Sequence, residues 1–322
     1  MGERTVGRFA PTPSGRMHLG NLLCALLAYL SARHAGGRFL LRIEDLDVPR
    51  CPRALAARAV EDLAWMGLKW DEKPLYQSER TDVYRRYLEE LTGRGLVYPC
   101  FCTRAQLRES AAPNLGDTQQ VYPGTCAHLT AEEAAALARN RSPALRLRVP
   151  DEELSFRDGL YGVYRENLAR DCGDFILRRS DGLFGYQLAV VVDDALSGVN
   201  EVVRGRDILS ATPRQLYLQR LLGFPVPAYV HIPLLTDSYG RRLAKRDRDA
   251  DLSALSRRMS REDILGLLAS SAGLLTENRP AGLSELIRDF SWARVRREDM
   301  RLSRSLGEGD APPNVSALNL RT

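Results

Sequence analysis

A histidine and two glycines near the amino terminus are spaced so that they could bind a phosphate. The stretch Arg8–Asn21 reads RFAPTPSGRMHLGN and lies between a short and a longer apolar run. If a strand precedes this loop and a helix begins at Gly20, the loop lies at the carboxyl edge of a parallel sheet, beside a positive helix N-terminus. Gly15 and Gly20 would let a nucleotide approach the backbone, and His18 could donate to phosphate oxygens. Spacing alone fits an ordinary loop histidine beside a turn somewhat better.

Three of the six cysteines are grouped in the sequence, at positions Cys100, Cys102 and Cys126. Structural zinc sites use four ligands, usually Cys or His, so this grouping fits a metal better than a disulfide framework. By residue type the natural fourth ligand is His128. Three free thiols without a metal are the alternative. Thiols kept reduced predict a cytoplasmic protein.

The segments that must position these residues alternate between strand and helix. Strands are predicted at Thr5–Ala10 and Arg38–Ile43, and helices at Asn21–Arg33, Arg53–Met66, Thr81–Thr92 and Asp207–Leu222. This order predicts a parallel sheet covered by helices. The alternation breaks near Tyr98 and resumes near Asp174, which indicates an insertion.

The composition is typical of a globular protein and not of a membrane protein. The 322 residues are 44% hydrophobic and 27% charged. No apolar run approaches the roughly 20 residues that a membrane helix needs, and the first residues do not predict a signal peptide. The formal net charge of +5 favours an anionic partner only slightly, because the charges are mixed along the chain.

The opening stretch closely resembles the first signature of class I aminoacyl-tRNA synthetases, in the form used by glutamyl-tRNA synthetases. The run His18-Leu19-Gly20-Asn21 stands where those enzymes carry a His-x-Gly-His element, with Asn in the fourth place. Three further segments resemble the same enzymes, namely LRIEDLD (41–47), YQSER (76–80) and GYQLAVVVDDALSGVNEVVRGRDIL (185–209). The resemblance runs through most of residues 8–248.

The resemblance implies which residues bind ATP. His18 and Lys245 would be the catalytic groups that stabilise the phosphates. Lys245 lies in RLAKR (242–246), which departs from the Lys-Met-Ser-Lys-Ser loop of the class in its first and third residues. The ATP-binding residues would be His18, Gly20, Asn21 and Lys245, and Mg²⁺ would accompany the nucleotide.

The resemblance also implies a glutamate pocket. Its residues would be Arg8, Phe9, Ala10, Pro11, Thr12, Glu44, Tyr186 and Arg204. Glu44 matches the acid that takes the ammonium group, and the two arginines match the residues that bind the amino acid, without indicating which takes which carboxylate. The pair Asp193-Asp194 is open to two interpretations, as nucleotide ligands or as a turn after an apolar run.

For the cysteine cluster, the nearest branch of the family implies a different fourth ligand. Its pattern is Cys-x-Cys followed by Tyr-x-x-x-Cys, which Tyr122-Pro-Gly-Thr-Cys126 matches. The implied set is Cys100, Cys102, Tyr122 and Cys126 around one structural Zn²⁺. A phenol would have to bind largely as phenolate, and His128 remains the rival ligand.

The cysteine pattern and the short segment after Arg248 are similar to the glutamyl-queuosine tRNA(Asp) synthetases within this family. The resemblance implies ATP-dependent activation of L-glutamate without a need for tRNA. Glutamate would then be transferred to the queuosine base at the anticodon wobble position of tRNA(Asp). The alternatives are a compact glutamyl-tRNA synthetase that charges a tRNA 3′ end and a non-catalytic tRNA-binding paralogue. A monomer is expected.

Together these observations predict an α/β fold with a split catalytic domain. We expect a Rossmann-like parallel-sheet domain, an inserted zinc-containing subdomain that resembles an acceptor-binding domain, and a helical region of the stem-contact type. The expected boundaries are 1–97 and 174–251 for the two catalytic halves, 98–173 for the insertion, 252–306 for the helical region and 307–322 for a disordered tail.

Overall fold

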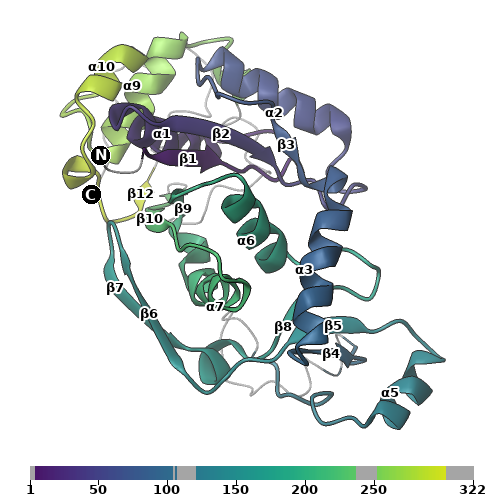
Figure 1. The fold of residues 1–322 in the computed structure, drawn as a ribbon. Helices are drawn as coiled ribbons and strands as arrows, with labels where there is room; N and C mark the ends of the chain where they lie inside the picture. The colour runs from purple at the N-terminus through teal and green to yellow at the C-terminus, as the bar shows by residue number, and fades with distance from the viewer. Residues whose placement is uncertain (1–3, 104–105, 107–120, 237–251, 302–322) are drawn as a thin grey trace.

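The centre of the protein is a five-stranded parallel sheet (Figure 1). The structure is a computed structural model, and it describes residues 4–103, 106, 121–236 and 252–301. The strands of the sheet are β1 (Val6–Phe9), β2 (Arg38–Ile43), β3 (Leu75–Tyr76), β9 (Glu201–Gly205) and β10 (Ala228–Ile232). They lie in the order β10-β9-β1-β2-β3, and every neighbouring pair is parallel. The predicted α/β fold with a parallel sheet is confirmed.

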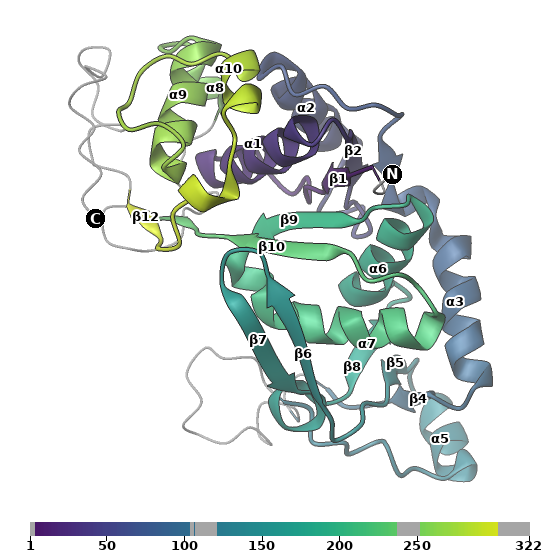
Figure 2. The ribbon, with the colours of Figure 1, turned by 60° about the vertical axis from the view of Figure 1, so that its left-hand side comes forward.

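The described part of the chain that lies between β3 and β9 in the sequence forms two smaller antiparallel sheets. One contains β4 (Val97–Cys100), β5 (Ala144–Leu147) and β8 (Phe175–Arg178), and the other is a hairpin of β6 (Glu153–Asp158) and β7 (Gly162–Asn167). A short helix, α5 (Ala131–Ala138), and a helical turn, η2 (Leu168–Cys172), complete this part. Figure 2 shows the hairpin running past α7 (Thr212–Leu222) to β10, and both elements contact β6.

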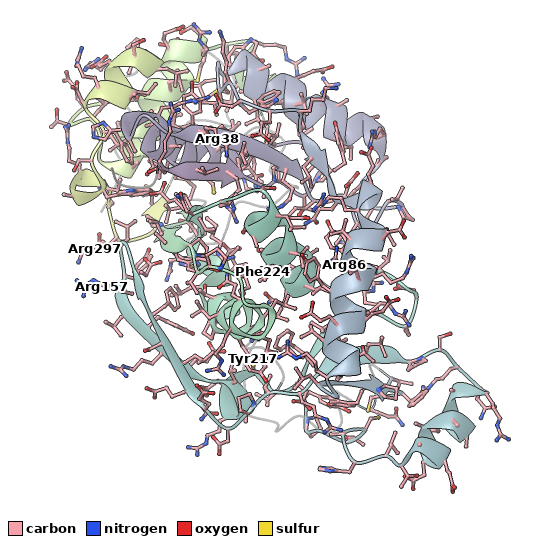
Figure 3. The ribbon with its side chains drawn as sticks, viewed as in Figure 1. Arg38, Arg86, Arg157, Tyr217, Phe224 and Arg297 are labelled. Carbon is pink, nitrogen blue, oxygen red and sulfur yellow. The ribbon has the colours of Figure 1, made fainter. Side chains whose placement is uncertain are left out.

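Three helices lie on the side of the sheet that faces the hairpin. They are α3 (Thr81–Gly93), α6 (Tyr186–Leu196) and α7, and contacts join α3 to α6 and α6 to α7. Their apolar side chains form one buried cluster that includes Leu88, Leu188 and Leu218. Side chains therefore fill the space that the ribbon leaves open between these helices (Figure 3).

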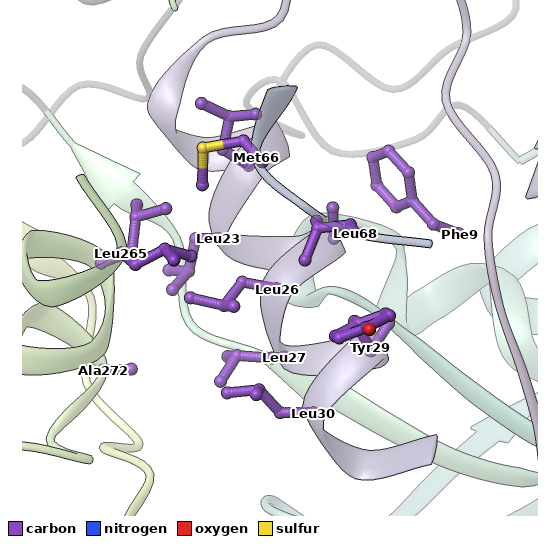
Figure 4. Packing of buried hydrophobic residues seen from close by; sticks show 14 of the residues in the cluster. Phe9, Leu23, Leu26, Leu27, Tyr29, Leu30, Met66, Leu68, Leu265 and Ala272 are labelled. Atoms are coloured by element: carbon purple, nitrogen blue, oxygen red, sulfur yellow. The ribbon is translucent and has the colours of Figure 1, made fainter. Parts of the chain in front are cut away.

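The helix α1 (Leu19–His34) is apolar nearly all round because it is covered on two sides. It contacts β1 and β9 on one side, and α9 (Arg261–Ala272) and α10 (Leu283–Arg288) on the other. Eleven of its sixteen residues are buried. Figure 4 shows the residues that pack here, among them Leu23, Leu26, Leu27, Leu30, Met66, Leu265 and Ala272. The N-terminus of α1 is thereby fixed at the carboxyl edge of the sheet.

The remaining elements are short, apart from one further helix, α2 (Arg53–Trp65). They are the turns η1 (Gln77–Glu79), η3 (Arg206–Ala211) and η5 (Trp292–Arg294), the helix α8 (Leu252–Leu255), and the paired strands β11 (Leu235–Thr236) and β12 (Met300–Arg301). Among the described residues, none of the helices combines the length and apolar character needed to cross a membrane. The expected tail 307–322 lies outside the described residues.

Two consecutive aspartates, Asp193 and Asp194, lie within α6 and carry a buried ion network, so the interpretation of this pair as a turn is wrong. Asp193, which is 0% exposed, accepts hydrogen bonds from Arg80 Nε (2.7 Å), Gln77 Nε2 (2.8 Å) and Tyr84 Oη (2.7 Å). The carboxylate thus joins α6 to η1 and α3. Buried charges persist in proteins only when they are paired and hydrogen-bonded in this way.

The second aspartate joins α6 to the central strands. Asp194 accepts from Arg8 Nε on β1 (3.2 Å) and from Arg42 Nη1 on β2 (2.5 Å). Arg42 Nη2 also donates to Glu44 Oε1 (3.2 Å). Burial works against ionisation of Asp194, but the two guanidinium groups leave the pKa of its carboxyl below the ordinary value. The network fixes where α6 begins relative to the sheet.

We predict that Asp193→Ala destabilises the protein by about 3–5 kcal/mol, because the change leaves buried cations without their partner. The free energy of unfolding should be measured by urea denaturation. Arg85→Ala is the matched control, since its ion pair with Asp82 is exposed and exposed pairs contribute little. Equal effects of the two substitutions would contradict the structural role of Asp193.

Candidate active site

A cavity of about 370 Å³ opens where the loop after β1 meets the ends of β9 and β10. This volume is within the range of small-molecule sites. The cavity lies at the carboxyl ends of parallel strands, where open α/β sheets bind ligands. Ten of the residues assigned to ligands from the sequence line it: Phe9, Ala10, Pro11, Thr12, His18, Gly20, Asn21, Glu44, Tyr186 and Arg204.

His18 caps the helix α1 with its own side chain. Its Nδ1 accepts a hydrogen bond from the Gly20 backbone N–H (3.1 Å), and its backbone N–H donates to Asn21 Oδ1 (3.4 Å). In a neutral imidazole, an Nδ1 that accepts places the proton on Nε2. Nε2 is therefore a donor at the lining of the cavity, beside the positive end of α1. This arrangement suits a phosphate group.

Gly20 is needed because the imidazole lies so close to the helix backbone. A Cβ at this position would lie 3.1 Å from the Cε1 and Nδ1 atoms of His18. Such a contact is tighter than most Cβ contacts, so a larger residue would require the ring to shift by a few tenths of an ångström. The glycine in the motif thus preserves the cap and the direction of the imidazole.

Arg204, at the end of β9, is the cationic residue held most firmly at the cavity. The residue is 4% exposed, and its guanidinium lies 5.1 Å from the centre of the Tyr229 ring. Its Nη1 donates to Gln215 Oε1 (2.7 Å) and its Nη2 to Thr212 Oγ1 (2.7 Å). Each terminal nitrogen carries two N–H groups and has one acceptor among the described residues, which leaves N–H groups that suit a carboxylate ligand.

Glu44 and Tyr186 line the cavity from two other elements. The side chain of Glu44 is 10% exposed, and burial raises the pKa of its carboxyl above the ordinary value although Arg42 and Arg8 oppose this shift. Tyr186 is the first residue of α6 and is 37% exposed. The preceding Gly185 must be a glycine, because a Cβ there would lie 2.4 Å from the Ile176 carbonyl oxygen.

One residue assigned from the sequence, Arg8, does not line the cavity, and another, Lys245, cannot be placed relative to it. Arg8 is 4% exposed, and its guanidinium donates to Asp194 and to the Val203 carbonyl oxygen (3.2 Å). It lies beside a different, smaller depression, so its contact with a ligand stays a prediction. Lys245, with the rest of its loop, lies outside the described residues.

The sequence analysis did not assign four polar residues that line the cavity, namely Ser14, Arg16, Cys24 and Asp207. Cys24 follows Gly20 by four residues and therefore lies on the same face of α1, a spacing that could have identified it. Burial raises the pKa of its thiol to about 12, which keeps the thiol protonated. Asp207 follows the end of β9, and this position at a strand end is a comparable signal.

The three clustered cysteines come together in the structure, away from the cavity. The sulfur atoms of Cys100, Cys102 and Cys126 all lie within 4.8 Å of one another. The Tyr122 hydroxyl lies 3.4 Å from the Cys100 sulfur and 3.6 Å from the Cys102 sulfur. His128 is exposed and is not part of this group. Four potential ligand atoms thus converge, as a tetrahedral metal site requires.

The surroundings of this cluster favour an anionic sulfur at Cys100, whereas burial raises the pKa of the Cys102 thiol to about 11 and raises that of the Tyr122 phenol as well. The Phe101 backbone N–H donates to the Cys126 sulfur (3.3 Å), and the Arg146 guanidinium lies 3.7 Å from the centre of the Tyr122 ring. Burial works against ionisation of Cys100, but its hydrogen bond with Tyr122 leaves the pKa of the thiol below the ordinary value. The residues present can therefore hold a metal ion.

Comparison with known proteins identifies relatives over nearly the whole chain. The family described as tRNA synthetases class I (E and Q), catalytic domain, matches residues 4–289. The glutamyl-Q tRNA(Asp) synthetase of Symbiobacterium thermophilum is 49% identical over 308 residues, which cover 92% of this chain and 95% of that protein. The protein of the same name from Nitratidesulfovibrio vulgaris is 49% identical over 85% of this chain and 88% of its own.

Solved structures show the same architecture. The crystal structure of a glutamate tRNA ligase from Elizabethkingia meningosepticum, in complex with its amino acid, superposes with a TM-score of 0.81 at 26% sequence identity. The superposition covers 94% of this chain and 68% of that one. The glutamate-tRNA synthetase of Elizabethkingia anophelis gives a TM-score of 0.82, over 94% of this chain and 69% of its own.

Proposed function

The chain belongs to the glutamyl-Q tRNA(Asp) synthetases within the class I tRNA synthetases (E and Q). On that premise we propose that it activates L-glutamate with ATP. We propose further that it transfers the glutamate to queuosine at the wobble position of tRNA(Asp). The observation that carries the proposal is the match at 49% identity along nearly the full length of both chains. The cavity supports it, because its residues suit an amino acid with two carboxylates beside a nucleotide phosphate.

The first step would be attack of the glutamate α-carboxylate oxygen on the α-phosphorus of ATP. The bond from that phosphorus to the oxygen that links it to the β-phosphorus would break, and pyrophosphate would leave. Mg²⁺ bound to the phosphates would neutralise part of their charge. Such a transfer depends on positioning and on stabilising the developing charge. His18 Nε2–H and the N-terminus of α1 would donate to the phosphate oxygens, and Lys245 would add a positive charge. Activation would not require RNA.

Recognition of glutamate would use opposite charges at two places in the cavity. The Glu44 carboxylate would accept from the ammonium group, and the free N–H pair of Arg204 would bind a carboxylate. Tyr186 and the loop residues 9–12 would enclose the ligand. Arg8, whose guanidinium also donates to Asp194, would be the second arginine that binds the amino acid. In the second step a nucleophile on the queuosine base would attack the acyl carbon, and AMP would leave.

We also propose that the inserted segment 98–173 is a zinc-containing subdomain that faces the RNA. One Zn²⁺ would bind Cys100, Cys102, Cys126 and Tyr122, because their four ligand atoms converge. Its chemistry there would be structural, since closed four-ligand sites of this kind stabilise small domains. The helical region 252–306 would contact RNA from the other side of the catalytic domain.

The test of the proposed function is transfer of labelled glutamate, with ATP, to two purified RNAs. We expect label on tRNA(Asp) that carries queuosine and none on tRNA(Glu). Label on tRNA(Glu) alone would instead show a compact synthetase that charges a 3′ end. If neither RNA is labelled and no glutamate-dependent ATP–pyrophosphate exchange occurs without RNA, the chain is a non-catalytic paralogue.

The raised pKa of Glu44 predicts how glutamate activation depends on pH. As the pH falls, the free carboxyl becomes protonated at a higher pH than an ordinary glutamate and loses its attraction for the ammonium group. The kcat/KM for glutamate in pyrophosphate exchange, which reports the free enzyme, should therefore fall on the acid side, and at a higher pH than the pKa of an ordinary glutamate would give.

Glu44→Gln should lower kcat/KM at least about tenfold near neutral pH, because a charge-assisted hydrogen bond is lost. It should also reduce the dependence on pH. Glu89→Gln, the same change on an exposed position of α3, is the control. An unchanged kcat/KM in Glu44→Gln would contradict the proposed role.

The choice of zinc ligands can be tested by metal content. Cys126→Ser and Tyr122→Phe should each lower the zinc that survives competition with a chelator, because each removes one of four ligands. His128→Ala should retain zinc like the unmodified protein, since that imidazole is exposed. Loss of zinc from His128→Ala but not from Tyr122→Phe would reverse the assignment.

A further inference from the structure

Behind Arg204, a histidine and an aspartate extend the chain of hydrogen bonds away from the cavity. Arg204 Nε donates to His231 Nε2 at 2.9 Å. His231 Nδ1 lies 2.6 Å from Asp158 Oδ2, which also accepts from the His231 backbone N–H (3.0 Å). The other oxygen of Asp158 accepts from the backbone N–H groups of Leu160 and Tyr161, both at 2.9 Å. The hydrogen-bonded series thus begins at Asp158, passes through His231 and ends at Arg204, which lines the cavity.

The hydrogen-bond partners on the two sides of His231, Arg204 and Asp158, require the same form of its imidazole. The Nε–H of an arginine can only donate, so the Nε2 atom of His231 must present its lone pair to it. An ionised carboxylate can only accept, so Nδ1 must carry the proton that points at Asp158. A doubly protonated ring would place an N–H against the guanidinium N–H at 2.9 Å. The geometry therefore selects the neutral Nδ1–H tautomer.

The surroundings keep the ring in this form. His231 is 0% exposed and Asp158 is 2% exposed. The charged groups that act on the ring come from three strands: Asp158 of β6, Arg204 of β9 and Arg8 of β1. The start of α7 adds the Thr212 hydroxyl, 3.3 Å from Nε2. Burial and the two arginines lower the pKa of His231 despite the attraction of Asp158.

Asp158 stays ionised in this position although it is buried. Burial works against its charge, but hydrogen bonds from His231 and from two backbone N–H groups leave the pKa of its carboxyl below the ordinary value. Each oxygen of the carboxylate faces N–H donors, so an amide in its place would set a donor against a donor. The hairpin of β6 and β7 thereby supplies a fixed acceptor to the central sheet.

We propose that His231, fixed by Asp158 as its neutral Nδ1–H tautomer, is a positioning residue that orients Arg204 toward the carboxylate of the amino-acid substrate. The proposal deepens the proposed function and depends on it for the identity of that substrate. Arg204 has three protein acceptors, one for each nitrogen, which fix the plane of the guanidinium. His231 supplies the acceptor for the Nε–H group. Without it, the guanidinium of Arg204 could tilt about its two remaining hydrogen bonds, to Gln215 and Thr212.

The tautomer itself is open to a direct test that needs no substrate. In ¹⁵N NMR of the full chain, the resonances of His231 are identified by their loss in His231→Gln. We expect Nδ1 to give the signal of a protonated nitrogen and Nε2 that of an unprotonated one at neutral pH. A protonated Nε2, in either the other tautomer or the cation, would overturn the proposal, because Nε2 could then not accept from Arg204.

The positioning role is tested by kinetics of glutamate-dependent ATP–pyrophosphate exchange. His231→Leu removes the acceptor and should raise the KM for glutamate about tenfold or more, since small misplacements of binding groups have effects of this size. The KM for ATP should change less than about threefold, because the phosphates lie at the α1 end of the cavity. His231→Gln keeps an acceptor that can face Arg204 and cannot be protonated, so it should restore much of the affinity for glutamate.

The control is His34→Gln, the same substitution on a histidine at the end of α1 that contacts the Ile287 carbonyl oxygen. Equal loss in His231→Leu and His231→Gln, or equal changes in the KM for glutamate and for ATP, would show a merely structural histidine and overturn the proposal. If the unmodified protein has no glutamate-dependent exchange, the proposed function fails, whereas the NMR result still decides whether the hydrogen-bonded chain exists.

Discussion

The site depends on one constraint, which is that the charges buried beneath the sheet must be paired. Asp193 and Asp194 are consecutive, so on a helix they point in directions about 100° apart and reach different partners. One binds Arg80 of the segment before α3, and the other binds Arg8 and Arg42 of the central strands. Because an unpaired buried charge is so unfavourable, α6 can dock in only one way. Tyr186, at its start, is thereby placed at the cavity.

A second consequence is that the cavity is built on rigid elements. His18 is held by the cap of a helix packed on two sides, Arg204 by three acceptors, and Glu44 by its contact with Arg42. Sites held within such frames keep their geometry before a ligand arrives, which lowers the cost of ordering them on binding. Only Lys245, among the residues assigned to phosphates, comes from a segment outside the described residues.

Much of this could be predicted from the sequence because local patterns determine it. The strand Arg38–Ile43 and the helix beginning at Arg53 were predicted as parts of the strand–helix alternation, and both are confirmed. The segment Asp207–Leu222 was predicted as one helix, whereas the structure has the turn η3 followed by α7. That prediction was wrong in its first turn, where Ile208 has non-helical backbone angles (φ −113°, ψ 17°).

Other features depend on contacts that no local pattern contains. The hairpin of β6 and β7 alternates exposed and half-buried residues and has little apolar signal, so the pairing of Asp158 with His231 could not be predicted. The separation in sequence between these two residues is 73. Likewise, His128 lies two residues from Cys126 and Tyr122 lies four residues from it, so closeness along the chain would favour the histidine, whereas in the fold the Tyr122 hydroxyl reaches the sulfurs.

If the chain has the proposed function, the way in which Arg204 is held affects which ligands its amino-acid site accepts. A guanidinium that still moved could adjust to several partners, but one with three fixed acceptors presents its remaining N–H groups in a single plane. A carboxylate oxygen can accept hydrogen bonds from these N–H groups. The NH₂ of an amide would instead place its own N–H donors against those of Arg204 inside a buried site. Leaving buried donors unpaired costs about 1–3 kcal/mol or more for charged groups. Rejection of neutral analogues of the bound carboxylate therefore follows from how the protein holds the arginine, as much as from the charge itself.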